Sequence, residues 1–150
     1  MEFAPFETAK KLKEKGFKKE CLAYYHTDGE LLYNKDQYRG GDYRSLLKSY
    51  NSLPKNPVGC EQIDAPTTSQ VLKWLSKEKK LYIEPCVLAD ADTNTDGKII
   101  NEYIYWSFSI TSIETANMIY FEYEHIDDKR FDSYEQAALA GVEYVLDNLI

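Results

Sequence analysis

The chain is poor in the residues and motifs on which catalysis and metal binding usually depend. It has two histidines, and it lacks a nucleophile elbow, a P-loop, a glycine-rich dinucleotide turn and any cluster with metal-ligand spacing. Its three cysteines, Cys21, Cys60 and Cys86, are isolated and have no CxxC spacing, which argues against a disulfide framework or a structural zinc site. We therefore expect a protein that is not an enzyme.

Long apolar runs and an excess of basic charge are also missing. No run approaches a membrane span and the N-terminus lacks a signal-peptide core, so we expect a cytoplasmic protein without a membrane partner. The net charge of −7 repels phosphate backbones, so no nucleic-acid partner is expected. The basic run from Lys10 to Lys19 is interpreted as a solvated helix face, with a phosphate-binding stripe as the alternative. An acidic surface can instead compete for a basic groove on a protein.

The hydrophobic patterns predict an α+β fold in one domain spanning residues 1–150, with an irregular segment near 34–65. A Thr-x-x-Gln capping box at Thr67 opens the clearest internal helix, and Ser133 opens the last one in the same way. The last helix should turn Ala138, Gly141, Val142, Val145 and Leu149 inward. The predicted helices cover residues 6–15, 67–79 and 133–149, and the predicted strands cover 21–25, 31–33, 82–89, 99–111 and 117–124. We expect an antiparallel β-meander with helices packed on one face.

Tyrosine is the residue that the chain has in excess, with thirteen in 150 positions. Strand 99–111 alternates, so Ile104, Trp106, Phe108 and Ile110 should lie under the helices and Tyr103 and Tyr105 on the opposite face. Pairing with strand 117–124 is expected to add Tyr120. Tyrosine suits surfaces that become buried on contact, which makes Tyr103, Tyr105 and Tyr120 the predicted binding residues. An ordinary half-exposed strand face is the alternative interpretation.

The loop between Asp90 and Lys98 carries the one motif with a specific chemical meaning. Asp92, Asn94 and Asp96 are spaced as in the first half of a calcium loop, and Asp90 adds a further oxygen. Position 12 of that loop is Tyr103 instead of the bidentate glutamate, and the flanks are strands instead of helices. We therefore expect a hairpin turn at Asp96-Gly97 and no cofactor, with a weak calcium site as the alternative.

Three segments carry a resemblance to a known family. They are residues 6–17, residues 65–75 and residues 134–141. In these segments the chain resembles a family of short uncharacterised proteins encoded by phages and prophages of gut bacteria. The shared motifs are helix-packing patterns, so the resemblance implies a common fold without a catalytic motif. It also implies an accessory protein that acts inside a bacterial cell.

These observations favour a non-catalytic accessory protein that works by binding, through contact with a protein partner or through self-association. Two alternatives remain. An aromatic sheet face beside a long loop and a basic helix suits a protein that sequesters a small, nucleotide-like ligand. The loop motif suits a weak calcium-binding domain.

Overall fold

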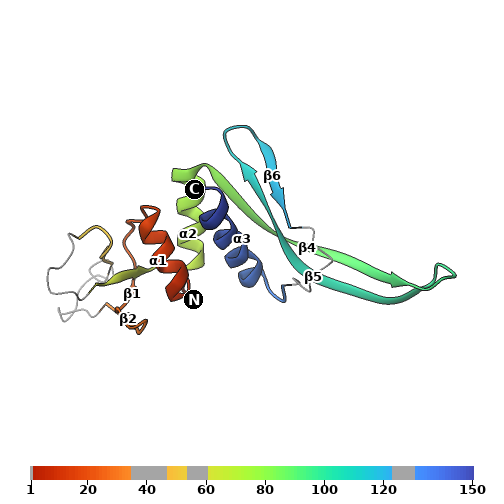
Figure 1. Ribbon diagram of the computed structural model, residues 1–150, viewed down its shortest axis with the longest axis horizontal. Helices are drawn as coiled ribbons and strands as arrows, with labels where there is room; N and C mark the ends of the chain where they lie inside the picture. The colour runs from red at the N-terminus through yellow and green to blue at the C-terminus, as the bar shows by residue number, and fades with distance from the viewer. Residues whose placement is uncertain (1, 35–46, 54–60, 123–130) are drawn as a thin grey trace. The chain divides into compact units, whose positions relative to one another are not determined.

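A computed structural model describes residues 2–34, 47–53, 61–122 and 131–150 of the chain (Figure 1). Within these ranges it contains three α-helices and two three-stranded antiparallel sheets, which confirms the predicted α+β class. The contacts divide the chain into two compact units, one of residues 1–74 and 146–150 and one of residues 75–145. The single domain spanning residues 1–150 stays a prediction. Among the described residues, no helix has the length and apolarity needed to span a membrane.

The first unit begins with helix α1 (Phe6–Glu14), whose end follows from Gly16. Gly16 has a φ of +90° and donates its N–H to the Lys13 carbonyl, while the Phe17 N–H reaches the Leu12 carbonyl. This pair of bonds is a Schellman motif, in which glycine adopts the left-handed conformation without strain. Phe17 then folds back and is fully buried, with its ring edge-on against the Trp74 ring.

The sheet of the first unit has the order β2-β1-β3. Strands β1 (Ala23–Tyr25) and β2 (Leu31–Tyr33) confirm the predicted hairpin. Strand β3 (Ile63–Ala65) lies at the end of the segment that was predicted to be irregular, and its three residues are too few for a periodicity to be recognised. Much of that segment, 35–46 and 54–60, lies outside the described residues. A small core packs α1 against this sheet through Ala9, Ala23, Tyr25, Ile63 and Ala65.

Asp64 is a fully buried carboxylate that ties the segment 49–51 to β3. It accepts hydrogen bonds from the backbone N–H groups of Tyr50 at 2.6 Å and Asn51 at 3.1 Å, and from the Ser49 hydroxyl at 3.0 Å. Burial raises the pKa of this carboxyl, and these three hydrogen bonds, together with the charge of Lys13, oppose the rise. The buried charge is therefore tolerated because its oxygens are well supplied with donors.

The substitution Asp64→Asn tests this anchor. An amide supplies one acceptor oxygen where the carboxylate supplies two, so an N–H of the 49–51 segment loses its partner at a cost of about 1–3 kcal/mol at neutral pH. A carboxyl with a raised folded pKa favours folding most while protonated, and that contribution is lost as the pH rises through the folded pKa. The stability gap between wild type and Asp64→Asn should therefore narrow from about pH 4 upward, measured by urea unfolding.

Asp28→Asn is the matched comparison, because the pKa of the exposed Asp28 carboxyl is lowered, chiefly by the backbone N–H of Glu30. The stabilisation that the Asp28 carboxylate provides is present above its unfolded pKa and is lost as the pH falls through its folded pKa. The difference in unfolding free energy between wild type and Asp28→Asn should therefore widen as the pH rises. If the stability differences of both variants changed with pH in the same direction, the raised pKa of Asp64 would be contradicted.

Helix α2 (Thr68–Trp74) and the π-helical turn η2 (Leu75–Lys79) follow one another in the chain across the boundary of the two units. The predicted capping box is present, since the Gln70 side chain accepts from the Thr67 N–H at 2.9 Å and the Thr67 hydroxyl accepts from the Gln70 N–H at 3.3 Å. Lys80, with a φ of +57°, ends the turn and leads into the second sheet.

The sheet of the second unit is the predicted meander, with the order β4-β5-β6. Strands β4 (Leu81–Thr93) and β5 (Ile99–Ser112) form a long hairpin. Strand β6 (Asn117–Phe121) pairs with the C-terminal end of β5, from Ser109 to Ser112. Pro85 predicts an edge position because it lacks an N–H, and β4 is indeed an edge strand. Residues directly opposite one another share a face, so Ile83, Ile110 and Phe108 lie together on what we call the inner face.

Helix α3 (Tyr134–Asn148) packs on the inner face at Gly141. A Cβ built on Gly141 would lie 2.6 Å from Cγ2 of Ile83 and 3.1 Å from Cδ2 of Phe108, so only glycine allows this approach. Four of the five residues predicted to face inward are buried, but Leu149 is 38% exposed. The helix ends at Asn148, one residue before Leu149, and Leu146 is buried in its place.

Gly141→Ala should destabilise the protein although alanine is the better helix former. Propensity alone favours alanine by about 1 kcal/mol, whereas overpacking of a full core costs about 1–3 kcal/mol. Urea unfolding should therefore give a lower free energy of unfolding for the variant. In a double-mutant cycle, Ile83→Ala removes the blocking methyl group, so the cost of Gly141→Ala should shrink in that background. A stabilised single variant would show that the helix does not approach this closely.

Candidate functional site

The distal part of the β4–β5 hairpin extends beyond the helix that covers its base (Figure 1). The two strands stay paired from Leu81 opposite Ser112 to Thr93 opposite Ile99, with a bulge after Asp92. Helix α3 starts at Tyr134, whose ring meets that of Trp106 edge-on at 5.8 Å. Residues 87–105, here called the arm, lie beyond that contact. All of them are described, and each is exposed or half-buried.

The inner face of the arm continues the apolar stripe of the core past the end of α3. Ile104, Trp106, Phe108 and Ile110 share this face, as their alternation predicts. The expectation that all four lie under helices is wrong for Ile104, which is 80% exposed, because α3 does not reach it. Val87 on the neighbouring strand is 52% exposed. The arm therefore presents large apolar side chains to solvent.

The outer face of the arm brings together two sets of residues that the sequence predicted separately. Tyr103 stands opposite Asp90, and Tyr105 stands opposite Leu88. The Tyr103 hydroxyl donates to Asp92 at 2.6 Å. Asp90 and Asp92 on β4 thus share one face with Tyr103 and Tyr105 on β5. Asp90 and the two tyrosines are half-buried, and Asp92 is exposed.

Tyr120 does not belong to this face, and the expectation that it shares a face with Tyr103 and Tyr105 is wrong. It stands opposite Ile110 on the inner face and stacks on Tyr144 of α3, with the ring centroids 3.8 Å apart. Its hydroxyl donates to the nearly buried Glu122 at 2.5 Å. The pairing register of β5 and β6 shifts between Ile110 and Thr111. A shift of one residue moves every side chain of a strand to the opposite face, so Tyr120 lies on the inner face.

The tip of the arm is a hairpin turn, as expected. The Asn94 side-chain oxygen accepts from the N–H groups of Asp96 and Lys98, each at 3.0 Å, and Gly97 adopts a φ of +76°. Asp90 accepts from the N–H of Ala91 at 2.8 Å. Of the four predicted calcium ligands, the side chains of Asp90, Asp92 and Asn94 therefore make separate contacts along the hairpin, and Asp96 takes part in the turn through its backbone N–H. Among the described residues, no group of three or more His, Cys, Asp or Glu side chains is placed to hold a metal ion.

A thermal unfolding scan with and without metal tests the calcium alternative. A ligand that binds only the folded state must raise the melting temperature. Because the Asn94 oxygen already serves the turn, we expect the same melting temperature in excess calcium and in EDTA. Asn94→Ala controls for the turn itself and should lower the melting temperature equally in both solutions. A rise in calcium that Asp92→Asn abolishes would establish the site.

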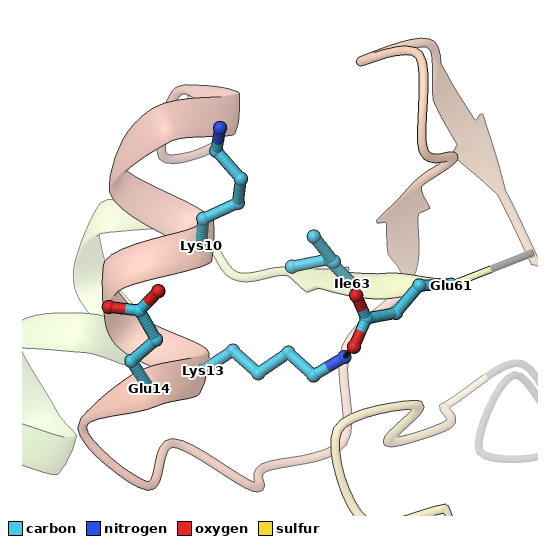
Figure 2. Close-up of a pocket in the computed structure, with 5 residues that line it drawn as sticks. All are labelled: Lys10, Lys13, Glu14, Glu61 and Ile63. Carbon is cyan, nitrogen blue, oxygen red and sulfur yellow. Dashed lines mark hydrogen bonds and ion pairs between the residues drawn. The ribbon is translucent and has the colours of Figure 1, made fainter. Parts of the chain in front are cut away.

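The first unit contains a pocket of about 410 Å³ between α1 and β3, lined by Lys10, Lys13, Glu14, Glu61 and Ile63 (Figure 2). Lys13 reaches Glu61 at 2.5 Å, and Lys10 is paired with Glu7 at 2.6 Å. An anion entering this pocket has to displace a carboxylate from a lysine. Its described lining includes no aromatic ring, and the tyrosine face belongs to the other unit. The nucleotide-like ligand stays a prediction.

The described cysteines, Cys21 and Cys86, are free thiols. Cys21 is fully buried, and burial, followed by the nearby charge of Asp64, raises the pKa of its thiol to about 12. Cys86 is half-buried, and burial also raises its pKa. A thiol with a raised pKa holds little thiolate at neutral pH and is a poor nucleophile. Cys60 lies outside the described residues.

No protein family model, curated protein or solved structure matches the chain.

Proposed function

We propose that the protein is a non-catalytic accessory protein of phage type, which acts inside a bacterial cell by binding a protein partner through the outer face of its arm. The observation that carries this proposal is the juxtaposition of Tyr103 and Tyr105 with Asp90 and Asp92 on one face of a hairpin that extends beyond its helix. The phage-type role rests on the sequence resemblance of three segments alone.

The chemistry of the outer face supports a partner that carries lysine or arginine. The arm holds four carboxylates, Asp90, Asp92, Asp96 and Glu102, against one lysine, Lys98, so its net charge is −3. A guanidinium or ammonium group approaching this face gains a carboxylate and an aromatic ring together. Tyrosine adds a large apolar area with little loss of rotamer freedom, which is why it is frequent in the centre of interfaces.

The arm also offers backbone that a partner can reach, but its edges discourage open-ended strand addition. Just before the arm, Pro85 removes a donor from the edge strand β4, and within the arm a bulge follows Asp92. Edge prolines, charges and bulges are the features by which natural sheets avoid pairing with other strands. Recognition through side chains of the outer face is therefore favoured over recognition through the edge.

The double substitution Tyr103→Ala with Tyr105→Ala tests the proposal. Tagged protein expressed in bacterial cells should retain specific partners that the double variant retains at least about tenfold less well, since the loss of central aromatic contacts costs 1.4 kcal/mol or more. Quantitative mass spectrometry of the captured proteins provides the measurement. Raising the salt concentration should weaken capture, because the contact is electrostatic in part.

Tyr33→Ala is the matched control, because Tyr33 is 61% exposed and lies in the other unit. It should capture the same partners as the wild type. Circular dichroism and the melting temperature should be unchanged for the double variant, whose side chains are only half-buried. Equal capture by wild type and the double variant would refute the outer face as the binding surface.

A further inference from the structure

The chain contains two Asp-Gly sequences, Asp28-Gly29 and Asp96-Gly97, and both lie in tight turns between paired strands. An aspartate before glycine rearranges to isoaspartate more readily than before other residues, because glycine has no side chain to hinder attack by its nitrogen. We infer that the folded protein undergoes this covalent change at Asp96, at the tip of the arm, and is protected from it at Asp28. The inference does not rest on the proposed function.

The rearrangement uses water and needs no other reactant. The Gly97 nitrogen attacks Cγ of the protonated Asp96 side chain, and the carboxyl hydroxyl leaves with the amide proton as water. The succinimide ring that results takes up one water at either of its carbonyl carbons. Opening at the α-carbonyl breaks the original peptide bond and leaves the main chain running through Cβ, which is isoaspartate. Opening at the other carbonyl restores aspartate.

The turn at Asp28 holds both reacting groups in place. The Asp28 carboxylate accepts from the Glu30 N–H at 3.0 Å, and the same oxygen lies 3.5 Å from Nδ1 of His26. The pKa of this carboxyl is lowered, chiefly by the Glu30 N–H, so little of the protonated acid that cyclises is present at neutral pH. A Cβ built on Gly29 would lie 3.3 Å from Cδ1 of Phe6, so this glycine is packed against a ring.

The turn at Asp96 lacks these restraints. Residues 94–98 are all exposed, and a Cβ built on Gly97 would meet nothing within 4 Å. Within the described residues the Asp96 carboxylate makes no hydrogen bond or ion pair, whereas its N–H donates to the Asn94 side chain at 3.0 Å. Each glycine N–H donates to a carbonyl three residues earlier, so that bond does not distinguish the turns. The difference lies in the carboxylate and in the packing of the glycine.

Isoaspartate at position 96 changes the tip of the arm. It adds one main-chain carbon between the N–H groups of Asp96 and Lys98, and both of these groups donate to the Asn94 side-chain oxygen. The Asn94 N–H also donates to the Lys98 carbonyl at 2.9 Å. A longer main chain does not fit these three bonds with their present geometry, so the turn rearranges. The protein therefore passes slowly into a second covalent form of unchanged mass.

Isoaspartate mapping on the full chain tests the inference. Purified protein is kept for several weeks at neutral pH and then digested with trypsin, which releases the two sequences in separate peptides, 20–35 and 81–98. Isoaspartate gives a peptide of unchanged mass that elutes separately and accepts a methyl group from isoaspartyl methyltransferase. Peptide 81–98 should contain at least about tenfold more of it than peptide 20–35, the effect expected from one charge-assisted hydrogen bond to the reacting carboxylate.

Asp96→Glu is the matched variant, because a glutamate has to close a larger ring and cyclises far more slowly. It should abolish methyl acceptance by peptide 81–98, whereas Asp28→Glu should leave that signal unchanged. The absence of isoaspartate at Asp96, equal amounts in the two peptides of the folded protein, or a signal that survives Asp96→Glu would each overturn the inference.

Incubation of the wild type in guanidinium chloride separates the effect of the fold from that of the sequence. Unfolding removes the Glu30 and Phe6 contacts of the first turn, so the two peptides should then accumulate isoaspartate to similar levels. A tenfold preference for Asp96 that persisted in the unfolded chain would show that neighbouring residues, and not the fold, protect Asp28, and would likewise refute the inference.

Discussion

The limited reach of α3 is the constraint on which the organisation of the second unit depends. The helix has 15 residues and a length of about 22 Å, whereas the 14 residues of β5 extend about 47 Å. One helix therefore covers about half of the hairpin that it packs against. The close contact at Gly141 places α3 over the base of the hairpin, because there the helix backbone lies close to Ile83 and Phe108.

The character of the arm follows from this mismatch in length. Alternation along a strand separates apolar from polar side chains over its whole length, whether or not a helix covers the apolar side. Near α3 the alternation produces a core with Ile110 fully buried, and six residues earlier in the same strand it leaves Ile104 exposed. The opposite side of the arm carries Tyr103 and Tyr105 together with Asp90 and Asp92. The two faces thus offer two kinds of contact, one apolar and one acidic and aromatic.

The first unit is organised by a buried polar group as well as by apolar packing. Asp64 stands between two residues of the small core on β3, and its carboxylate holds the backbone of Tyr50 and Asn51. A three-residue strand buries little apolar surface, so these hydrogen bonds contribute much of what keeps the adjoining segment in place. The same charge helps to keep the Cys21 thiol protonated.

Much of the fold was predictable from local signals in the sequence. The capping box at Thr67 and the alternation of strand 99–111 act over a few residues, and each predicted the right element. Pro85 likewise indicated an edge strand. β3 was not predicted, because three residues carry no period, and the predicted inward position of Leu149 was wrong because the helix ends one residue earlier.

The candidate site divides in the same way. The amino-acid pattern alone was enough to place Tyr103 and Tyr105 on one face, since alternation is a property of a single strand, and to predict a turn at Asp96-Gly97. Three features emerged only from the folded chain: Tyr120 lies on the other face, Asp90 and Asp92 share a face with the two tyrosines, and Ile104 is exposed. These three features depend on strand register and on where a helix ends against a sheet. Both are set by packing between segments distant in the chain, which no local pattern records.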